Sequence, residues 1–123
     1  MEKCILCDRK GEKHHIIHKK DGGLNIKINY LYLCSKHHRG ENSPHRNSLI
    51  DLEYKLELQE QLFYLFRKQY YSFEEIQDIL ETSKSITKKV VKNLRHYKNG
   101  YKSHDIVKAL MGGKIYQNNL KKS

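Results

Sequence analysis

The sequence contains no tryptophan, one proline and three cysteines. It has no apolar run near the roughly 20 residues that a membrane-spanning helix needs, which excludes a membrane-spanning class. Its first residues lack the long apolar stretch of a signal peptide, so we expect a cytoplasmic protein with no membrane partner. An odd number of cysteines without an export signal argues against a disulfide framework and favours reduced thiolates that bind a metal.

Acidic residues are scarce relative to basic ones. The chain has 24 Lys and Arg against 14 Asp and Glu, and its net charge is +10. A charge of this sign favours a polyanionic partner such as nucleic acid. The excess is uneven, because residues 83–123 hold eleven basic residues and one acidic residue, whereas residues 51–82 hold three and eight. Basic surfaces are therefore expected on both sides of an acidic middle.

At 123 residues the chain is too short for two ordinary domains with large separate cores, although a metal-stapled unit and a small helical unit would fit. Cys4 and Cys7 are separated by two residues, as are Cys34 and His37. Zinc takes four nitrogen or sulfur ligands, and such gaps let each pair grip one ion from a tight turn. The spacing predicts a structural zinc on these four residues. The alternative is three buried cysteines that serve as small hydrophobes.

Further histidines and an asparagine lie among these four residues. They are His14-His15-Ile16-Ile17, then Gly22-Gly23, then Asn29 five positions before Cys34, then His38 directly after His37. Together with the Cys/His spacing, this order resembles the HNH nuclease family over residues 4 to about 47. The resemblance implies a ββα-metal fold and metal-dependent hydrolysis of DNA phosphodiester bonds. Such hydrolysis needs a base that deprotonates water and a cation that neutralises charge on the phosphate.

The resemblance also implies a role for each residue. His15 would be the general base, which suits neutral pH because the unperturbed pKa of histidine is about 6.5. Asn29 would fix the loop that joins the two strands and so orient His15. His14 and His38 would hold one divalent cation, while His45 is either its third ligand, a surface histidine or a phosphate contact. Many relatives have aspartate at position 14, so the histidine leaves Mg²⁺, Mn²⁺, Ni²⁺ and Zn²⁺ open as the catalytic ion.

In residues 1–47, the expected HNH domain, the sequence predicts a strand around His15 to His18, a second around Leu24 to Leu33, and a helix that starts near Ser35. A connecting helix is expected within residues 48–70, from Ser48 to about Lys68, because apolar residues recur there at three- and four-residue steps. Its apolar stripe must be covered, either inside the chain or in a dimer.

Residues 71–117 are expected to form an all-helical unit that resembles a helix-turn-helix, and residues 118–123 a polar tail. Ser72 and Glu75 have the spacing of a capping box, which predicts a helix that continues through Leu80.

Two more helices are expected in this unit. The first runs roughly from Ser85 to Tyr97 and stops at Asn99-Gly100, where glycine can take the left-handed C-terminal position. Ser103 is expected to cap the last helix, which would end at Gly112-Gly113.

The Ser85 to Tyr97 helix is also the candidate nucleic-acid contact. On a helical wheel its apolar residues gather on one side, and the opposite side carries Lys84, Lys88, Lys92 and Arg95. A cationic helix of this kind suits the phosphates that border a DNA major groove. The alternative is a solvated lysine-rich face, and RNA stays open as the nucleic acid.

The sequence therefore predicts an α+β protein, in which a zinc-stapled ββα-metal domain precedes a helical DNA-binding unit. The expected activity is metal-dependent endonucleolytic cleavage of DNA, and small HNH proteins of this build resemble those of phages and mobile elements. The alternative from another class is a non-catalytic zinc-dependent DNA-binding or regulatory protein, including one that acts on a host nuclease.

Overall fold

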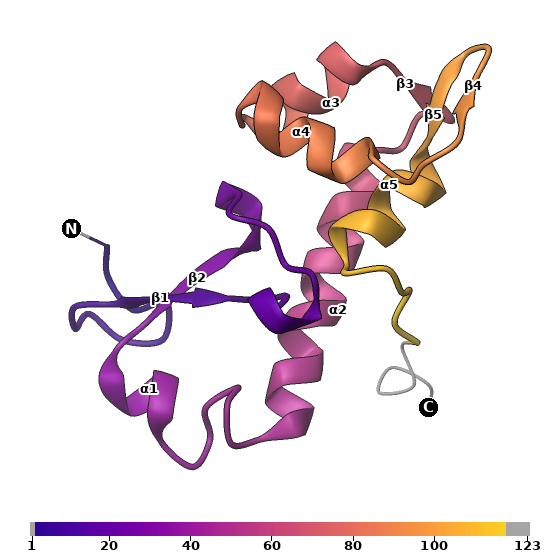
Figure 1. The fold of residues 1–123 in the computed structure, drawn as a ribbon. Helices are drawn as coiled ribbons and strands as arrows, with labels where there is room; N and C mark the ends of the chain where they lie inside the picture. The colour runs from indigo at the N-terminus through magenta and orange to yellow at the C-terminus, as the bar shows by residue number, and fades with distance from the viewer. Residues whose placement is uncertain (1, 118–123) are drawn as a thin grey trace.

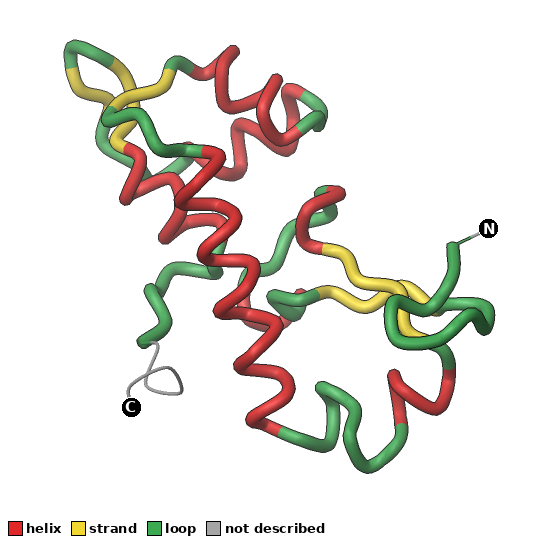
Figure 2. Tube along the Cα trace, turned by 180° about the vertical axis from the view of Figure 1, so that it is seen from behind, coloured by secondary structure: helices red, strands yellow, loops and turns green. Residues whose placement is uncertain are grey.

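Helix α2, Ser48–Leu65, connects two groups of elements in the computed structural model, which describes residues 2–117. The N-terminal elements lie beside its first half, and the C-terminal elements surround its other end (Figure 1). The view from behind shows the same long helix as the spine of the molecule (Figure 2). The predicted connecting helix is therefore present, and it ends at Leu65 rather than near Lys68.

The N-terminal group is built on an antiparallel hairpin of β1, Glu12–His15, and β2, Tyr30–Leu33. The predicted strands were His15 to His18 and Leu24 to Leu33, so the first was displaced and the second too long. The reason is packing: Ile16 and Ile17 are consecutive and both buried, which the alternating side chains of a one-sided hairpin do not allow. The chain therefore leaves β1 after His15 and reaches β2 through two short 3-10 turns.

Helix α1, Ser35–Arg39, follows β2 and begins at Ser35, as predicted, with Cys34 as its N-cap residue. A loop then leads to α2, where the Asn47 side chain accepts hydrogen bonds from the backbone N–H groups of Leu49 and Ile50 (3.1 and 3.2 Å). An asparagine at this position satisfies donors that the first turn of a helix leaves unpaired. The order β1, β2, α1 is the ββα order that the sequence predicted.

The C-terminal group opens with β3, Tyr70–Tyr71, and helix α3, Phe73–Leu80. The capping box is confirmed, because the Ser72 hydroxyl accepts from the Glu75 N–H (3.1 Å) and the Glu75 carboxylate accepts from the Ser72 N–H (2.9 Å). A turn at residues 81–83 leads to helix α4, Lys84–Val91.

The prediction of an all-helical C-terminal unit was wrong, since the unit also holds a three-stranded antiparallel sheet. Its other strands are β4, His96–Tyr97, and β5, Gly100–Lys102, in the order β3-β5-β4. The helix predicted to reach Tyr97 ends at Val91, because the segment from His96 pairs with β5 instead. Gly100 has φ +116, and a Cβ there would lie 2.5 Å from the Tyr71 carbonyl oxygen. Gly100 thus belongs to a hairpin and not to a helix end.

Helix α5, Ser103–Leu110, closes the group. Ser103 was expected to cap it, but Lys102 is the N-cap residue and the Ser103 hydroxyl donates to the Phe66 carbonyl after α2. The predicted end is confirmed by the positive φ of Gly112 (+82), whose Cβ would lie 2.3 Å from the Asp21 carbonyl oxygen. The expected tail at 118–123 lies outside the described residues.

One hydrophobic core joins the two groups of elements. Leu58, Leu62 and Phe66 pack in one cluster with Ile17 of the N-terminal group and Ile106 of the C-terminal group, all at most 2% exposed. The stripe of α2 is therefore covered from within the chain. None of the helices among residues 2–117 is long and apolar enough to cross a membrane.

Candidate metal centres and basic surface

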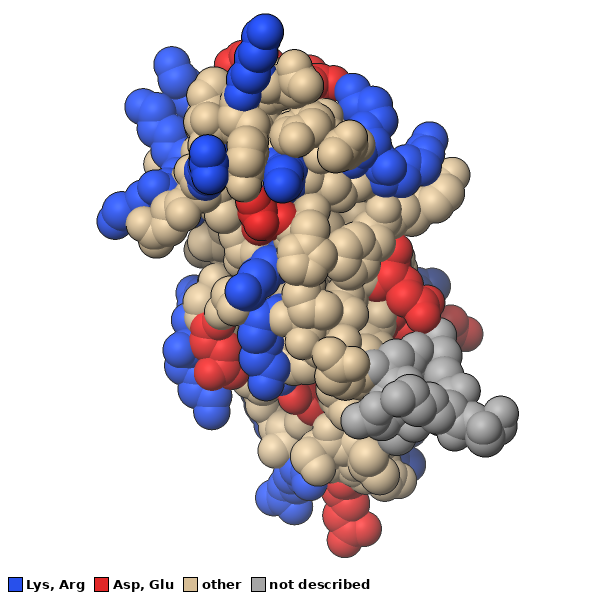
Figure 3. All heavy atoms as spheres, turned by 90° about the vertical axis from the view of Figure 1, so that its right-hand side faces the viewer, with Lys and Arg blue, Asp and Glu red and all other residues tan. Residues whose placement is uncertain are grey.

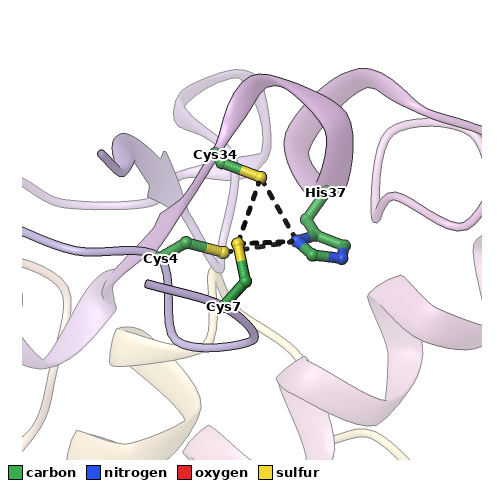
Figure 4. Close-up of side chains that lie close together, drawn as sticks. All are labelled: Cys4, Cys7, Cys34 and His37. Carbon is green, nitrogen blue, oxygen red and sulfur yellow. Dashed lines mark hydrogen bonds between the residues drawn. The ribbon is translucent and has the colours of Figure 1, made fainter. Parts of the chain in front are cut away.

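The first candidate centre is the predicted Cys/His set. Cys34 Sγ lies 3.2 Å from His37 Nδ1 and 3.7 Å from Cys7 Sγ, and Cys4 Sγ lies 3.4 Å from the same His37 nitrogen. Figure 4 shows the three sulfur atoms and this nitrogen converging on one point. Three thiol groups and one imidazole are donors that structural zinc prefers, so the set is consistent with a structural zinc.

Local geometry brings these four side chains together. Cys4 and Cys7 lie in a turn closed by pairing of Lys3 with Lys10, while Cys34 and His37 occupy the start of α1, one helical turn apart. Burial opposes ionisation of Cys4, but hydrogen bonds from backbone N–H groups, including that of Cys34, lower its pKa to about 6. A low pKa favours the thiolate form that binds metal.

The second candidate centre is a cluster of histidines that the sequence assigned to the catalytic ion. One ring nitrogen each from His14, His38 and His45 lies within 4.8 Å of the other two. The Nε2 atoms of His38 and His45 are 2.9 Å apart, and the His14 ring centre lies 4.9 Å from that of His45. The three come from β1, α1 and the loop before α2, so the hairpin, the helix and the loop each supply one donor.

His14 is the buried member of this cluster. It is 2% exposed, and its Nε2 atom has no hydrogen-bond partner among the described residues. The pKa of His14 is lowered to about 4, mainly because the ring is buried and to a smaller extent because other histidines lie nearby. A histidine in this setting stays neutral at physiological pH, which is the form that binds a cation.

A carboxylate holds the orientation of His38. Glu12 precedes His14 by two residues on β1, so both side chains project to one face of the hairpin. The Glu12 carboxylate lies 2.9 Å from His38 Nδ1 and 3.2 Å from Arg39. A carboxylate on one ring nitrogen leaves the other nitrogen, Nε2, free for a metal.

Two residues that the sequence did not assign to the site extend it toward α2. His18 Nε2 lies 3.0 Å from Asp51 Oδ1, and the two residues form a second group of donors with His14. From the sequence, His18 was placed only at the end of a predicted strand. Its spacing of four residues from His14 was a usable signal, whereas Asp51 is 33 residues from His18 and no local pattern connects them.

His15, the expected general base, belongs to neither group. Its Nε2 atom is 2.8 Å from Asn25 Oδ1, and its ring stands edge-on to Tyr30, the residue opposite it on β2. An amide oxygen only accepts, so His15 Nε2 carries the proton and Nδ1 keeps its lone pair. Asn25, in the loop between the strands, was missed because it lies outside the motif.

Asn29 is 2% exposed and fastens the loop between β1 and β2. Its Oδ1 accepts from the Ile17 N–H (2.8 Å), and its Nδ2 donates to the carbonyl groups of Ile17 (3.0 Å) and Leu24 (3.1 Å). The asparagine therefore forms hydrogen bonds with backbone groups of the segment that follows His15.

The predicted nucleic-acid residues do not share one helix. Lys84 and Lys88 lie on α4, Lys92 is its C-cap residue, and Arg95 lies beyond it before β4; all four are exposed. Lys and Arg side chains stand out at the upper end of the molecule, which the C-terminal group forms (Figure 3). Arg95 also borders a hollow of about 470 Å³ between α4 and α5, together with Lys89 and Lys108.

Comparisons with known proteins do not assign this chain to a family. No protein-family model, no curated protein and no solved structure matches it. The two candidate centres and the basic surface are therefore the features of the chain that bear on its function.

Proposed function

We propose that the protein is a metal-dependent endonuclease of the HNH type that hydrolyses DNA phosphodiester bonds. The observation that carries the proposal is His14, a buried histidine whose Nε2 has no partner among the described residues. One nitrogen of its ring lies within 4.8 Å of ring nitrogens of His38 and His45. A buried polar atom without a partner is costly, so a ligand that satisfies it stabilises the site. The surrounding β1, β2 and α1 order supports a ββα-metal fold.

The residues of the N-terminal group would divide the work of hydrolysis. His14, His38 and His45 hold a divalent cation, which when bound neutralises charge that grows on the scissile phosphate. His15 accepts the proton of the attacking water at Nδ1, because Asn25 engages its Nε2. Asn29 keeps the backbone after His15 in place and so positions the base.

The C-terminal group would bind the DNA duplex. Its cations come from α4, from Arg95 just before β4 and from the half-buried Lys102 of β5. The Arg95 guanidinium and the Lys102 ammonium lie 4.7 and 4.6 Å from the centre of the Tyr97 ring. These stacked cations suit phosphate contacts on both sides of a groove. Such contacts raise affinity without reading the sequence.

Nicking of supercoiled plasmid tests the proposal, with Mg²⁺, Mn²⁺, Ni²⁺ and Zn²⁺ each added to zinc-loaded protein. His15→Ala should lower the rate by about 10²- to 10⁴-fold with the effective ion, the usual contribution of a general base. His104→Ala removes an exposed histidine of α5 and is the matched control. Equal nicking by His15→Ala and unaltered protein rejects the proposal.

The second candidate is a non-catalytic zinc-dependent DNA-binding or regulatory protein. It is favoured by the completeness of the Cys/His centre, whose four donors need nothing from the histidine cluster to bind zinc. Metal counting separates the two functions. One tight and one exchangeable divalent ion support the nuclease, whereas a single tight zinc supports the scaffold.

A further inference from the structure

His14 is shared by two groups of potential metal donors. It lies within 4.8 Å of donor atoms of His38 and His45 in one group, and of His18 and Asp51 in the other. We propose that the second group is an alternative position for the divalent ion, selected by Mn²⁺, whereas the all-histidine group is selected by Zn²⁺. The proposal rests on the metal binding that the proposed function requires, but not on cleavage.

The second group has the geometry of a partly buried site. His18 Nε2 and Asp51 Oδ1 are 3.0 Å apart, and their side chains are 21% and 17% exposed. The ring centres of His14 and His18 are 5.6 Å apart in an edge-on arrangement. One carboxylate oxygen and two imidazoles thus converge where the end of β1 meets the first turn of α2.

A single nitrogen makes the two positions exclusive. The His14 Nε2 atom has one lone pair, and it is the His14 nitrogen that is buried without a partner among the described residues. One lone pair binds one ion at a time. The five donor side chains also form two overlapping groups rather than one. Besides His14, a bound ion therefore engages either His38 and His45 or His18 and Asp51.

The two positions differ in chemistry. Three neutral imidazoles suit Zn²⁺ and Ni²⁺, while a carboxylate oxygen raises preference for Mn²⁺ and Mg²⁺. Asp51 of α2 would supply such a carboxylate from outside residues 1–47.

Lys55 orients that carboxylate. Its ammonium lies 2.7 Å from Asp51 Oδ2, one helical turn further along α2, and its side chain is 12% exposed. With Oδ2 occupied, Oδ1 is directed at His18. Ligating carboxylates are commonly held by such a second contact. The competing explanation is an ion-pair chain from Lys55 through Asp51 to His18 that binds no metal.

Equilibrium metal binding tests the proposal on full-length protein whose Cys/His centre is loaded with zinc. Mn²⁺ binding is followed by electron paramagnetic resonance of the free ion, and exchangeable Zn²⁺ by competition with a chromogenic chelator. Asp51→Asn and His18→Gln should each weaken Mn²⁺ binding by more than about 10-fold, since the loss of even an outer partner of a ligand costs that much. Both should leave exchangeable Zn²⁺ binding unchanged. His45→Gln should do the reverse, and His14→Gln should weaken both.

The pattern across variants decides the outcome. Asp51→Asn that leaves Mn²⁺ affinity unchanged, or that weakens Mn²⁺ and Zn²⁺ equally, overturns the second position. His18→Gln keeps the test decisive if Asp51→Asn loses its pair with Lys55 and unfolds, as judged by thermal unfolding of the zinc-loaded protein. Failure of the proposed function has a separate signature, namely equal plasmid nicking by His15→Ala and the unaltered protein. The absence of any exchangeable ion in the unaltered protein overturns both proposals.

Discussion

His37 and His38 are consecutive, yet their imidazoles belong to two different candidate metal centres. His37 Nδ1 lies 3.2 Å from Cys34 Sγ, whereas His38 Nε2 lies 2.9 Å from His45 Nε2. Neighbouring residues of a helix project about 100° apart, so α1 directs one histidine to each side. The short helix α1 therefore contributes one histidine to the set that is consistent with a structural zinc and one to the histidine cluster.

The division at α1 predicts different effects of the two histidines on tight zinc. His37→Ala should lose the zinc that resists dialysis and lower the melting temperature, while His37→Cys should keep the zinc because a thiolate replaces the missing donor. His38→Ala should retain tight zinc. Metal content after dialysis is the measurement, and loss of tight zinc from His38→Ala would contradict the assignment.

Asn29 should contribute more to the free energy of unfolding than an average side chain does. Asn29→Ala removes three hydrogen bonds at a buried site and leaves the Ile17 and Leu24 carbonyl groups without this donor, so we expect a loss of about 2 to 4 kcal/mol in urea unfolding. Asn29→Asp keeps the acceptor for the Ile17 N–H but removes both donors. It should therefore destabilise the protein as well, and a stability equal to the unaltered chain would show that the loop does not depend on this side chain.

Asn25 should fix the tautomer of His15. Nitrogen-15 NMR of the imidazoles should find His15 protonated at Nε2 and unprotonated at Nδ1 at about pH 8, because the Asn25 carbonyl oxygen accepts the Nε2 proton. Asn25→Ala should yield a mixture of tautomers and lower kcat more than it changes KM. A pure Nδ1–H tautomer in the unaltered protein would place the free lone pair on the wrong nitrogen for the proposed base.

The basic surface predicts a salt-dependent affinity for duplex DNA. Replacing Lys84, Lys88 and Arg95 together with glutamine should reduce the slope of log affinity against log salt by about 0.9 for every phosphate that these side chains neutralise. Lys68→Gln is the control, since that ammonium is paired with Glu75 at 2.7 Å and lies in the acidic middle of the chain. Affinity should be measured by fluorescence anisotropy without divalent ions, and equal slopes for the triple variant and the unaltered protein would remove these cations from the interface.

Local patterns in the sequence predicted the elements whose determinants are local. The capping box at Ser72 and Glu75 set the start of α3, and the Cys-x-x-Cys and Cys-x-x-His spacings set the first metal centre. The helix predicted from Ser85 to Tyr97 was too long because the apolar spacing continues past Val91 as it would in a helix. Pairing of His96 and Tyr97 with a strand that follows in the sequence decided the structure there.

In the histidine cluster, too, some residues were expected from the sequence and others were brought together only by the tertiary structure. His14 and His38 were expected together from a family resemblance, with His45 as one possible third ligand, and the structure brings ring nitrogens of all three within 4.8 Å of one another. His18 and Asp51 join His14 only because α2 packs across the loop that Asn29 fastens. A contact over 33 residues leaves no periodic trace in the chain.

The sequence by itself determined the types of donor residue, the spacing of the Cys/His pairs and the net positive charge that favours a polyanionic partner. It also determined the positions of the long helix α2 and of the next helix, α3. Each of these depends on composition or on residues within a few turns of each other. Only the tertiary structure decided which face of the hairpin His14 and His15 occupy, where α4 ends, and that a carboxylate from α2 reaches the histidine cluster. Those outcomes depend on packing between distant segments, because the burial of Ile17, Leu62 and Ile106 in one core fixes how the two ends of the chain meet α2.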